Sequence, residues 1–284
     1  MPRRIIVNAD DLGLCTSVNT AIFEVFRAGN LSSATLMVNM PGTRDAVDRL
    51  RDHPGLAVGL HFCITEGRAL SGVSTLTDEE GRFMDRSALA KAAFRGHVEL
   101  VDIRRELEAQ FARAAEMGVR LTHVDSHQHV LMLPPVFEAA VAVLTGAGLP
   151  IRIVHPPLRT LTSDLARPLR VVRQLANLFF AQRIRSRWLG ASNHRLVSIH
   201  DLPGAGPYDA ATFRRLVQRT GGAQVTELMV HPYILGEDLL SLYSDELDRK
   251  TPFLKRCAAE YQALKGERIF TQEELITYAD LMGR

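Results

Sequence analysis

The sequence predicts an α/β fold built from repeated strand–helix units, either a parallel barrel or a doubly wound sheet. Two observations lead to this expectation. Short apolar runs alternate along the chain with longer segments whose apolar residues recur at helical spacing. The chain has 284 residues, and one α/β barrel takes about 250, so we expect a single domain over residues 1–284.

Apolar runs mark the predicted strands, and helical patterns follow most of them. The strands are predicted at residues 5–7, 34–38, 56–61, 121–124, 151–154, 195–200 and 227–230, with a further candidate at 268–270. Helices are predicted at residues 18–26, 43–51, 100–114, 134–144 and 209–218, within 245–264, and from a capping box at 271–274 onward. Residues 63–97 and 156–192 are predicted insertions after the third and fifth strands.

The composition excludes several classes of protein. Hydrophobic residues make up 46% and charged residues 23%, as in an ordinary soluble enzyme. The net charge of +2 and the lack of a dense basic run argue against a nucleic-acid partner. The cysteines, Cys15, Cys63 and Cys257, lie far apart, which favours a reducing compartment. Residues 5–7 are too short for the core of a signal peptide, and no apolar run approaches a membrane span, so we expect a cytoplasmic protein.

Polar residues of the kind that bind metals come directly after the predicted strands. They are Asp10, Asp11, Asn39, His61, Asp125, His127, His129, His155 and His231. Singly, each is more often a turn, cap or packed core residue. In an α/β barrel, however, the carboxyl ends of the strands meet at one face, so these side chains are predicted to share one pocket.

Three features of this set point to metal-assisted hydrolysis. Leu12-Gly13 directly after the Asp pair lets the chain turn and aim both carboxylates into one site, and His127 and His129 are alternate residues that would face the same side of a strand. One carboxylate and two imidazoles suit zinc, cobalt, nickel, manganese or iron, whereas magnesium prefers more oxygen ligands. Asp10 can then act as the base and His231 as the acid in the hydrolysis of an amide.

Residues 7–13, 58–62, 122–129 and 229–232 resemble the four signature blocks of YdjC-like carbohydrate deacetylases, and the resemblance extends from Arg3 to about Tyr233. It implies a distorted (β/α) TIM-like barrel and removal of the N-acetyl group from an amino sugar. The resemblance implies Asp11, His61 and His127 as ligands of one divalent metal, with Asp10 as general base and His231 as general acid. Zinc or magnesium is expected, with manganese, cobalt or nickel as alternatives.

Four further residues are expected to bind the substrate or to support the metal ligands: Arg152, which matches a family arginine, together with His129, Asp125 and Asn39. Two rival interpretations stay open. One is an oxygenase with a two-His-one-carboxylate metal site, and the other is a non-catalytic sugar-binding protein on the same fold.

Residues 165–189 mix bulky apolar residues with arginines. They predict either a helix packed on the barrel or a peripheral contact with the inner membrane. Together with the overall similarity, this segment suggests the hopanoid-associated subgroup, whose substrate would be an N-acetylglucosaminyl hopanoid lipid. We also expect a homodimer.

Overall fold

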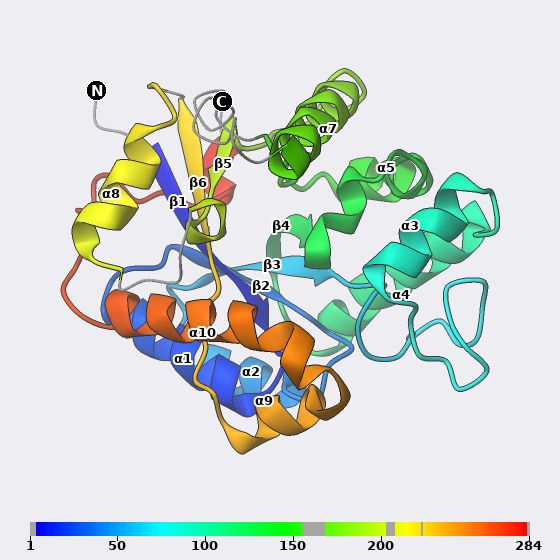
Figure 1. Ribbon diagram of the computed structural model, residues 1–284, viewed down its shortest axis with the longest axis horizontal. Helices are drawn as coiled ribbons and strands as arrows, with labels where there is room; N and C mark the ends of the chain where they lie inside the picture. Colours follow the sequence, from blue (N-terminus) through cyan, green and yellow to red (C-terminus); the bar gives the residue numbers. More distant parts are fainter. Residues whose placement is uncertain (1–3, 156–167, 203–207, 223, 283–284) are drawn as a thin grey trace.

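The computed structural model describes residues 4–155, 168–202, 208–222 and 224–282. Its centre is a sheet of parallel strands in the order β4-β3-β2-β1-β6-β5 (Figure 1). The strands are β1 (Arg4–Leu12), β2 (Ser33–Leu36), β3 (Ala57–Phe62), β4 (Leu121–Ser126), β5 (Arg195–Val197) and β6 (Val225–Val230). The predicted α/β class and parallel sheet are therefore confirmed, and each of these strands overlaps a predicted one.

The two edge strands, β4 and β5, are joined through residues 150–155. Ile151 forms parallel bridges to Val124 of β4 and to Ser192, just before β5. The predicted fifth strand at 151–154 is therefore only an irregular segment. The reason is visible at the next pairing position, where the N–H of Ile153 donates to the side-chain oxygen of Asn193 (2.8 Å) instead of to a neighbouring strand. The result is a distorted barrel.

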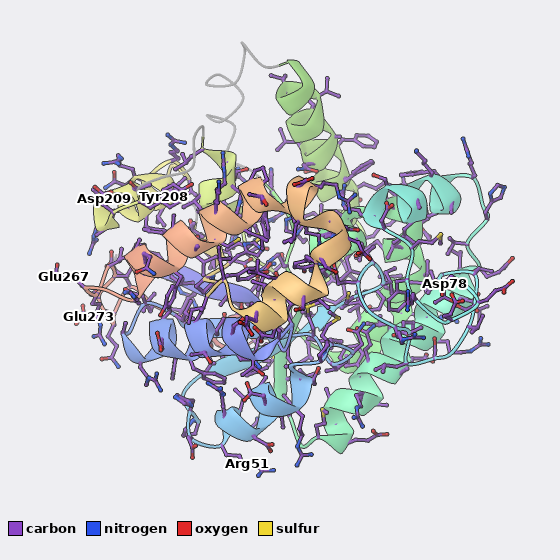
Figure 2. All side chains as sticks on the ribbon, turned by 60° about the horizontal axis from the view of Figure 1, so that its bottom comes forward. Arg51, Asp78, Tyr208, Asp209, Glu267 and Glu273 are labelled. Atoms are coloured by element: carbon purple, nitrogen blue, oxygen red, sulfur yellow. The ribbon has the colours of Figure 1, made fainter. Side chains whose placement is uncertain are left out.

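Helices and short 3₁₀ turns surround the sheet. The helices are α1 (Thr16–Arg27), α2 (Thr43–Leu50), α3 (Arg86–Phe94), α4 (Leu100–Glu116), α5 (Pro134–Ala147), α7 (Pro168–Arg185), α8 (Ala210–Gln218), α9 (Glu237–Leu242) and α10 (Leu247–Leu264). The 3₁₀ turns are η1 (His127–Met132), η2 (Ile199–Asp201), η3 (Ser244–Glu246) and η4 (Ala279–Leu281). Helices α9 and α10 pack beside α1, and α7 packs beside α5 (Figure 1). Charged side chains such as Arg51, Asp78 and Glu267 point away from the body of the molecule (Figure 2).

Two predicted elements at the C-terminal end are wrong. Residues 268–270 form no strand, because the N–H of Ile269 donates to the side chain of Asn30 (2.7 Å). The capping-box contact from the N–H of Thr271 to Glu274 forms (2.9 Å), but no helix follows it. Leu275 instead pairs with Ile5 at the start of β1, so sheet pairing outcompetes the local helix signal.

Two other segments also differ from expectation. The predicted strand at 195–200 ends at Val197, and the chain then forms η2. The insertion at 63–97 is partly regular, because it contains α3, whose N-terminus is capped by Asp85. The second insertion contains α7, and residues 165–167 of the segment at 165–189 lie outside the described residues.

A glycine in β3 allows a histidine and a tyrosine to stack inside the barrel. The rings of His123 and Tyr278 lie parallel, with centroids 4.3 Å apart, and both residues are buried. A Cβ atom on Gly59 would lie 2.5 Å from the His123 ring. This contact is shorter than van der Waals packing allows, so only glycine fits here.

We expect Gly59→Ala to lower the free energy of unfolding by about 1–3 kcal/mol, because the added methyl group overpacks this stack. Urea denaturation measures the change. Gly146→Ala in α5 is the control, because nothing lies within 4 Å of a Cβ at that position. Alanine is the better helix former, so the control should be neutral or slightly stabilising. Equal stability of the two variants would contradict the proposed packing role of Gly59.

Candidate metal centre and active site

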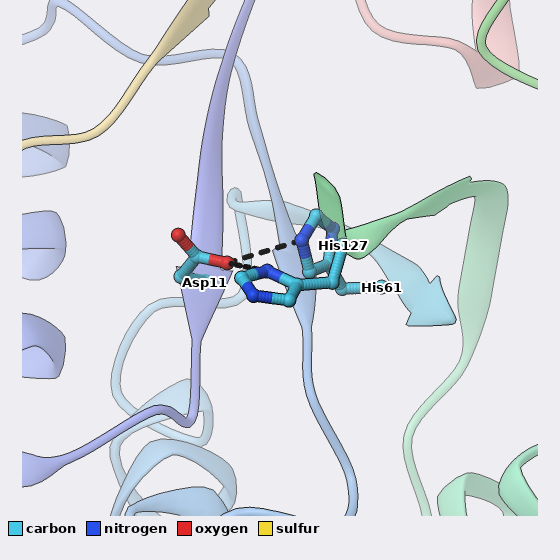
Figure 3. Close-up of side chains that lie close together, drawn as sticks. All are labelled: Asp11, His61 and His127. Atoms are coloured by element: carbon cyan, nitrogen blue, oxygen red, sulfur yellow. Dashed lines mark hydrogen bonds and ion pairs between the residues drawn. The ribbon is translucent and has the colours of Figure 1, made fainter. Parts of the chain in front are cut away.

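Three predicted ligands from three different strand ends come together in the structure (Figure 3). Asp11 lies in β1, His61 in β3, and His127 directly after β4. The Nε2 atom of His61 lies 3.1 Å from Asp11 Oδ1, and the Nδ1 atom of His127 lies 2.9 Å from the same oxygen. One ligand atom from each residue lies within 4.8 Å of the others. All three side chains are buried.

The ionisation of this group is strongly shifted. Burial alone would raise the pKa of Asp11, but the charges and hydrogen bonds of His127 and His61 hold this pKa well below 3.8. Burial alone would lower the pKa of His61, but Asp125 and Asp11 raise it to about 10. The pKa of His127 is also raised, against the effect of burial, chiefly by Asp11. The pocket thus favours positive charge at the two imidazoles.

A bulge in β1 aims both aspartates into the site. The register between β1 and β2 is irregular from Ala9 to Leu12, and Asp11 has a left-handed φ of 66°. Adjacent strand residues would normally face opposite sides, and a bulge removes that constraint. The sequence interpretation attributed this aim to a turn at Leu12-Gly13. The strand instead runs through both aspartates to Leu12, so the cause is the bulge.

His127 and His129 are not alternate residues of a strand, so this part of the prediction is wrong. Strand β4 ends at Ser126, and η1 begins at His127. Gln128 and His129 have left-handed φ values of 51° and 57°. Outside glycine, the described residues have no other positive φ values besides that of Asp11. Strain of this kind concentrates at functional sites. The turn places His127 at Asp11 and leaves His129 lining the cavity.

Arg152 binds carboxylates from three strands. Its guanidinium contacts both oxygens of Asp10 at 2.6 Å, and it also contacts Asp125 and Glu227 at 2.6 Å. The Tyr278 hydroxyl donates to Glu227 at 2.5 Å. Burial alone would raise the pKa of Asp10, but Arg152, followed by His61 and His231, lowers it below its usual value. Asp10 is therefore ionised at neutral pH.

Asp125 orients His61 through the ring nitrogen that faces away from Asp11. The Nδ1 atom of His61 lies 2.6 Å from Asp125 Oδ1, and the Thr35 hydroxyl donates to Asp125 Oδ2 at 3.0 Å. A carboxylate behind a histidine fixes its tautomer and ring plane, as is common at metal sites. The expected supporting role of Asp125 thus has a geometric basis.

His231 approaches the site from the other side. Its Nε2 atom lies 3.8 Å from Asp10 Oδ2 and 3.9 Å from Asp11 Oδ2. Its main-chain N–H donates to Glu260 of α10 at 2.6 Å. Burial lowers the pKa of His231 and raises that of Glu260 to about 8.

The three potential metal ligands lie at a cavity of about 1190 Å³. Its lining includes Asp10, Asp11, His61, His127, His129, His231 and Asn39. Asn39 donates to the carbonyl of Glu66 (3.0 Å) and thereby ties the loop after β3 to the cavity wall. His155 is not among the residues that line this cavity, and its ring contacts Arg195 (2.9 Å).

Several residues of the site were not predicted from the sequence. Glu66 lies in the insertion, where its carboxylate is 3.4 Å from His127 Nε2 and 3.3 Å from Lys250 Nζ. The Tyr233 hydroxyl donates to Asp11 Oδ2. Tyr233 is only two residues from His231, so the block at 229–232 could have pointed to it. Glu227 was visible as an acid inside an apolar strand, which already suggests a buried partner.

The residues present fit a divalent metal. Asp10, Asp125 and Glu227 share the buried guanidinium of Arg152, whereas Asp11 contacts the rings of His61 and His127. The Asp11 carboxylate and the two rings can therefore bind a cation together. Asp11, His61 and His127 supply one oxygen and two nitrogen donors, a set that suits zinc and related metals.

The chain has extensive sequence similarity to known proteins. A family model described as YdjC-like protein matches residues 4–272. A carbohydrate deacetylase of Geobacillus stearothermophilus is 38% identical over 241 residues, covering 85% of this chain and 84% of the relative. A carbohydrate deacetylase of Brevibacillus brevis is 33% identical over 285 residues, covering 98% and 99%. A chitooligosaccharide deacetylase of Yersinia pestis is 41% identical over 154 residues, covering 54% and 60%.

The fold has a counterpart among solved structures. The crystal structure of an Enterococcus faecalis protein matches with a TM-score of 0.70 over 99% of both chains, at 21% sequence identity. This likeness concerns the fold alone, and it agrees with the barrel described above.

We expect Arg152→Met to lower the free energy of unfolding by about 3–5 kcal/mol, because three buried carboxylates lose their cation. Urea denaturation at neutral pH measures the loss. Arg44→Met is the control, because Arg44 is 72% exposed and pairs with Asp48 in the next turn of α2. Its effect should stay within about 0.5 kcal/mol. If Arg152→Met were as mild as the control, Arg152 would not have the structural importance given to it here.

Proposed function

The chain belongs to the YdjC-like protein family, and on that premise we propose that it is a carbohydrate deacetylase acting on N-acetylated amino sugars. The observation that carries the proposal is the pairing of a potential metal centre with a separate, ionised carboxylate. Asp11, His61 and His127 converge, and Asp10 lies beside them in the same cavity. Metal-assisted amide hydrolysis uses these two parts, together with a proton donor for the amine.

Asp11, His61 and His127 would hold one divalent metal ion. Such an ion polarises a carbonyl oxygen and makes a water molecule more acidic. Asp125 and Thr35 hold His61 in place, and Tyr233 holds the second oxygen of Asp11. The chain's own contribution here is to fix the donor atoms before the substrate arrives.

Asp10 and His231 would move the protons. Asp10 accepts a proton from the attacking water, whose oxygen bonds to the acetyl carbon. The carbon–nitrogen bond then breaks, and His231 gives a proton to the departing amine, so that acetate and the free amino sugar leave. Arg152 keeps Asp10 ionised and holds both of its oxygens. His231 Nε2 lies 3.8 Å from Asp10 Oδ2, so the base and the acid face the same point of the cavity.

His129 and Asn39 would contact the sugar, because both line the cavity beside these groups. A cavity of about 1190 Å³ is larger than a single sugar needs, so an oligosaccharide or a glycolipid fits it better. Hydrolysis uses the ionised Asp10 directly, whereas a two-His-one-carboxylate oxygenase or a sugar-binding protein would have no use for this base.

Substitutions of a metal ligand and of the general base should have different effects on metal content. We expect His61→Ala to lose metal and acetate release together. Asp10→Asn should keep its metal and lose about 10²- to 10⁴-fold in turnover, the usual contribution of a general base. The measurements are metal analysis of the purified proteins and coupled acetate detection with N-acetylated oligosaccharides and glycolipids. His97→Gln, at an exposed position, is the control and should keep both. Full metal content in His61→Ala would exclude His61 as a ligand, and absence of acetate from the unaltered protein with every metal tried would exclude the deacetylase function.

We further propose a lipid-linked substrate, such as an N-acetylglucosaminyl hopanoid, presented by α7. Ala181 and Ile184 of this helix are buried, so one face packs on the barrel. Val172, Leu175 and Phe179 are 62%, 52% and 65% exposed, so an apolar surface remains in contact with solvent. The sequence of α7 also contains arginines, and this combination is typical of helices that lie on a membrane surface. No helix among the described residues is long and apolar enough to cross a membrane.

Replacing Val172, Leu175 and Phe179 together by serine should weaken binding to anionic liposomes, because it removes the exposed apolar face of α7. Co-sedimentation at low and high salt measures the effect, and salt should weaken binding by the unaltered protein. Phe94→Ser is the control, because Phe94 is 57% exposed on a different helix, α3. Undiminished binding by the triple variant would contradict the membrane proposal while leaving deacetylation untouched.

A further inference from the structure

A second group of metal-binding side chains lies on the far side of His231. It consists of His200 in η2, His231 after β6, and Glu260 in α10. One ligand atom from each residue lies within 4.8 Å of the others. Glu260 is fully buried, His231 is 9% exposed, and His200 is partly buried.

Each of these residues has a buried atom that lacks a hydrogen-bond partner within the described part of the chain. These atoms are His200 Nε2, His231 Nδ1 and Glu260 Oε1. An unsatisfied buried polar atom is unfavourable, so three in one place call for a ligand. The other oxygen of Glu260 accepts the main-chain N–H of His231 at 2.6 Å, which fixes the carboxylate next to the two rings.

Aromatic packing fixes the orientation of the two imidazoles. The His200 ring stacks on Phe253 at 4.9 Å, and the His231 ring meets the edge of the same Phe at 5.5 Å. The two imidazoles meet almost at a right angle (88°), with centroids 5.1 Å apart. Both histidines line the large cavity, so a small ion can reach them from solvent.

We propose that His200, His231 and Glu260 bind a second divalent metal ion of the zinc class. Two imidazole nitrogens and one carboxylate oxygen form a preferred donor set for such an ion, and three protein ligands leave a coordination position open. This site is separate from the one at Asp11, because His231 turns its Nε2 atom toward Asp10 and Asp11 and has Nδ1 left for the second group.

The second ion would also affect the proposed reaction, and this consequence rests on the proposed function. An imidazole that binds a metal through Nδ1 carries its proton on Nε2. In His231 that is the nitrogen that faces Asp10, where the proton donor is needed. The ion would therefore hold His231 in the tautomer that can act as an acid.

Zinc counting tests the second site without any need for turnover. Metal-free protein is titrated with Zn²⁺ by calorimetry, and bound zinc is then counted after gel filtration. We expect two zinc ions in the unaltered protein, one in Glu260→Gln, one in His200→Asn and one in His61→Ala. His53→Gln is the control with two, because His53 packs on Phe23 away from both groups. Thermal melts check that each variant folds. If Glu260→Gln does not fold, the zinc count of His200→Asn decides the test.

The outcomes are distinct. Zinc counts of two, one and one for the unaltered protein, His200→Asn and His61→Ala support the second site. A single zinc ion in the unaltered protein that is retained in His200→Asn, or two zinc ions in His200→Asn, would overturn it. Because zinc is counted directly, failure to release acetate would affect only the proposed deacetylase function.

Discussion

Arg152 lies where the segment that closes the barrel meets the strands, and its guanidinium contacts carboxylates from β1, β4 and β6 at 2.6 Å. Residues 150–155 form no regular strand and are attached by isolated bridges at Ile151 and scattered hydrogen bonds, so this ion network is an important further attachment of the segment. The same contacts gather Asp10, Asp125 and Glu227 at one place. Closure of the barrel and assembly of the candidate site thus both depend on the buried guanidinium of Arg152.

Much of the fold could be predicted because local periodicity and tertiary structure agree over most of the chain. The disagreements occur where pairing partners are distant in sequence. Residues 271–274 form their capping-box contact, yet Leu275 pairs with Ile5, some 270 residues away in the sequence. Residues 151–154 have the composition of a strand, but the side chain of Asn193 takes one of their backbone hydrogen bonds. Neither the pairing with Ile5 nor the contact with Asn193 can be seen in a local window of sequence.

The site was predictable to the extent that it follows the strand ends. Asp11, His61 and His127 meet because parallel strands deliver their carboxyl ends to one face. The backbone that aims them was not predictable, since a bulge at Asp11 and left-handed residues after His127 depend on neighbouring strands. Glu66 and Glu260 were missed for a different reason. Glu66 comes from an insertion and Glu260 from the middle of a helix, and no rule about strand ends applies to either.

The charge balance explains how such an acidic pocket can remain stable. The pKa values of His61 and His127 are both raised, so a proton on either ring is stabilised beside Asp11. A metal ion requires both rings in their neutral form, and its binding therefore releases these protons. Two protons and one divalent ion carry the same charge. The exchange thus leaves the field at Asp10 and Arg152 nearly unchanged, and the buried ion network can stay in place whether protons or a metal balance the carboxylates.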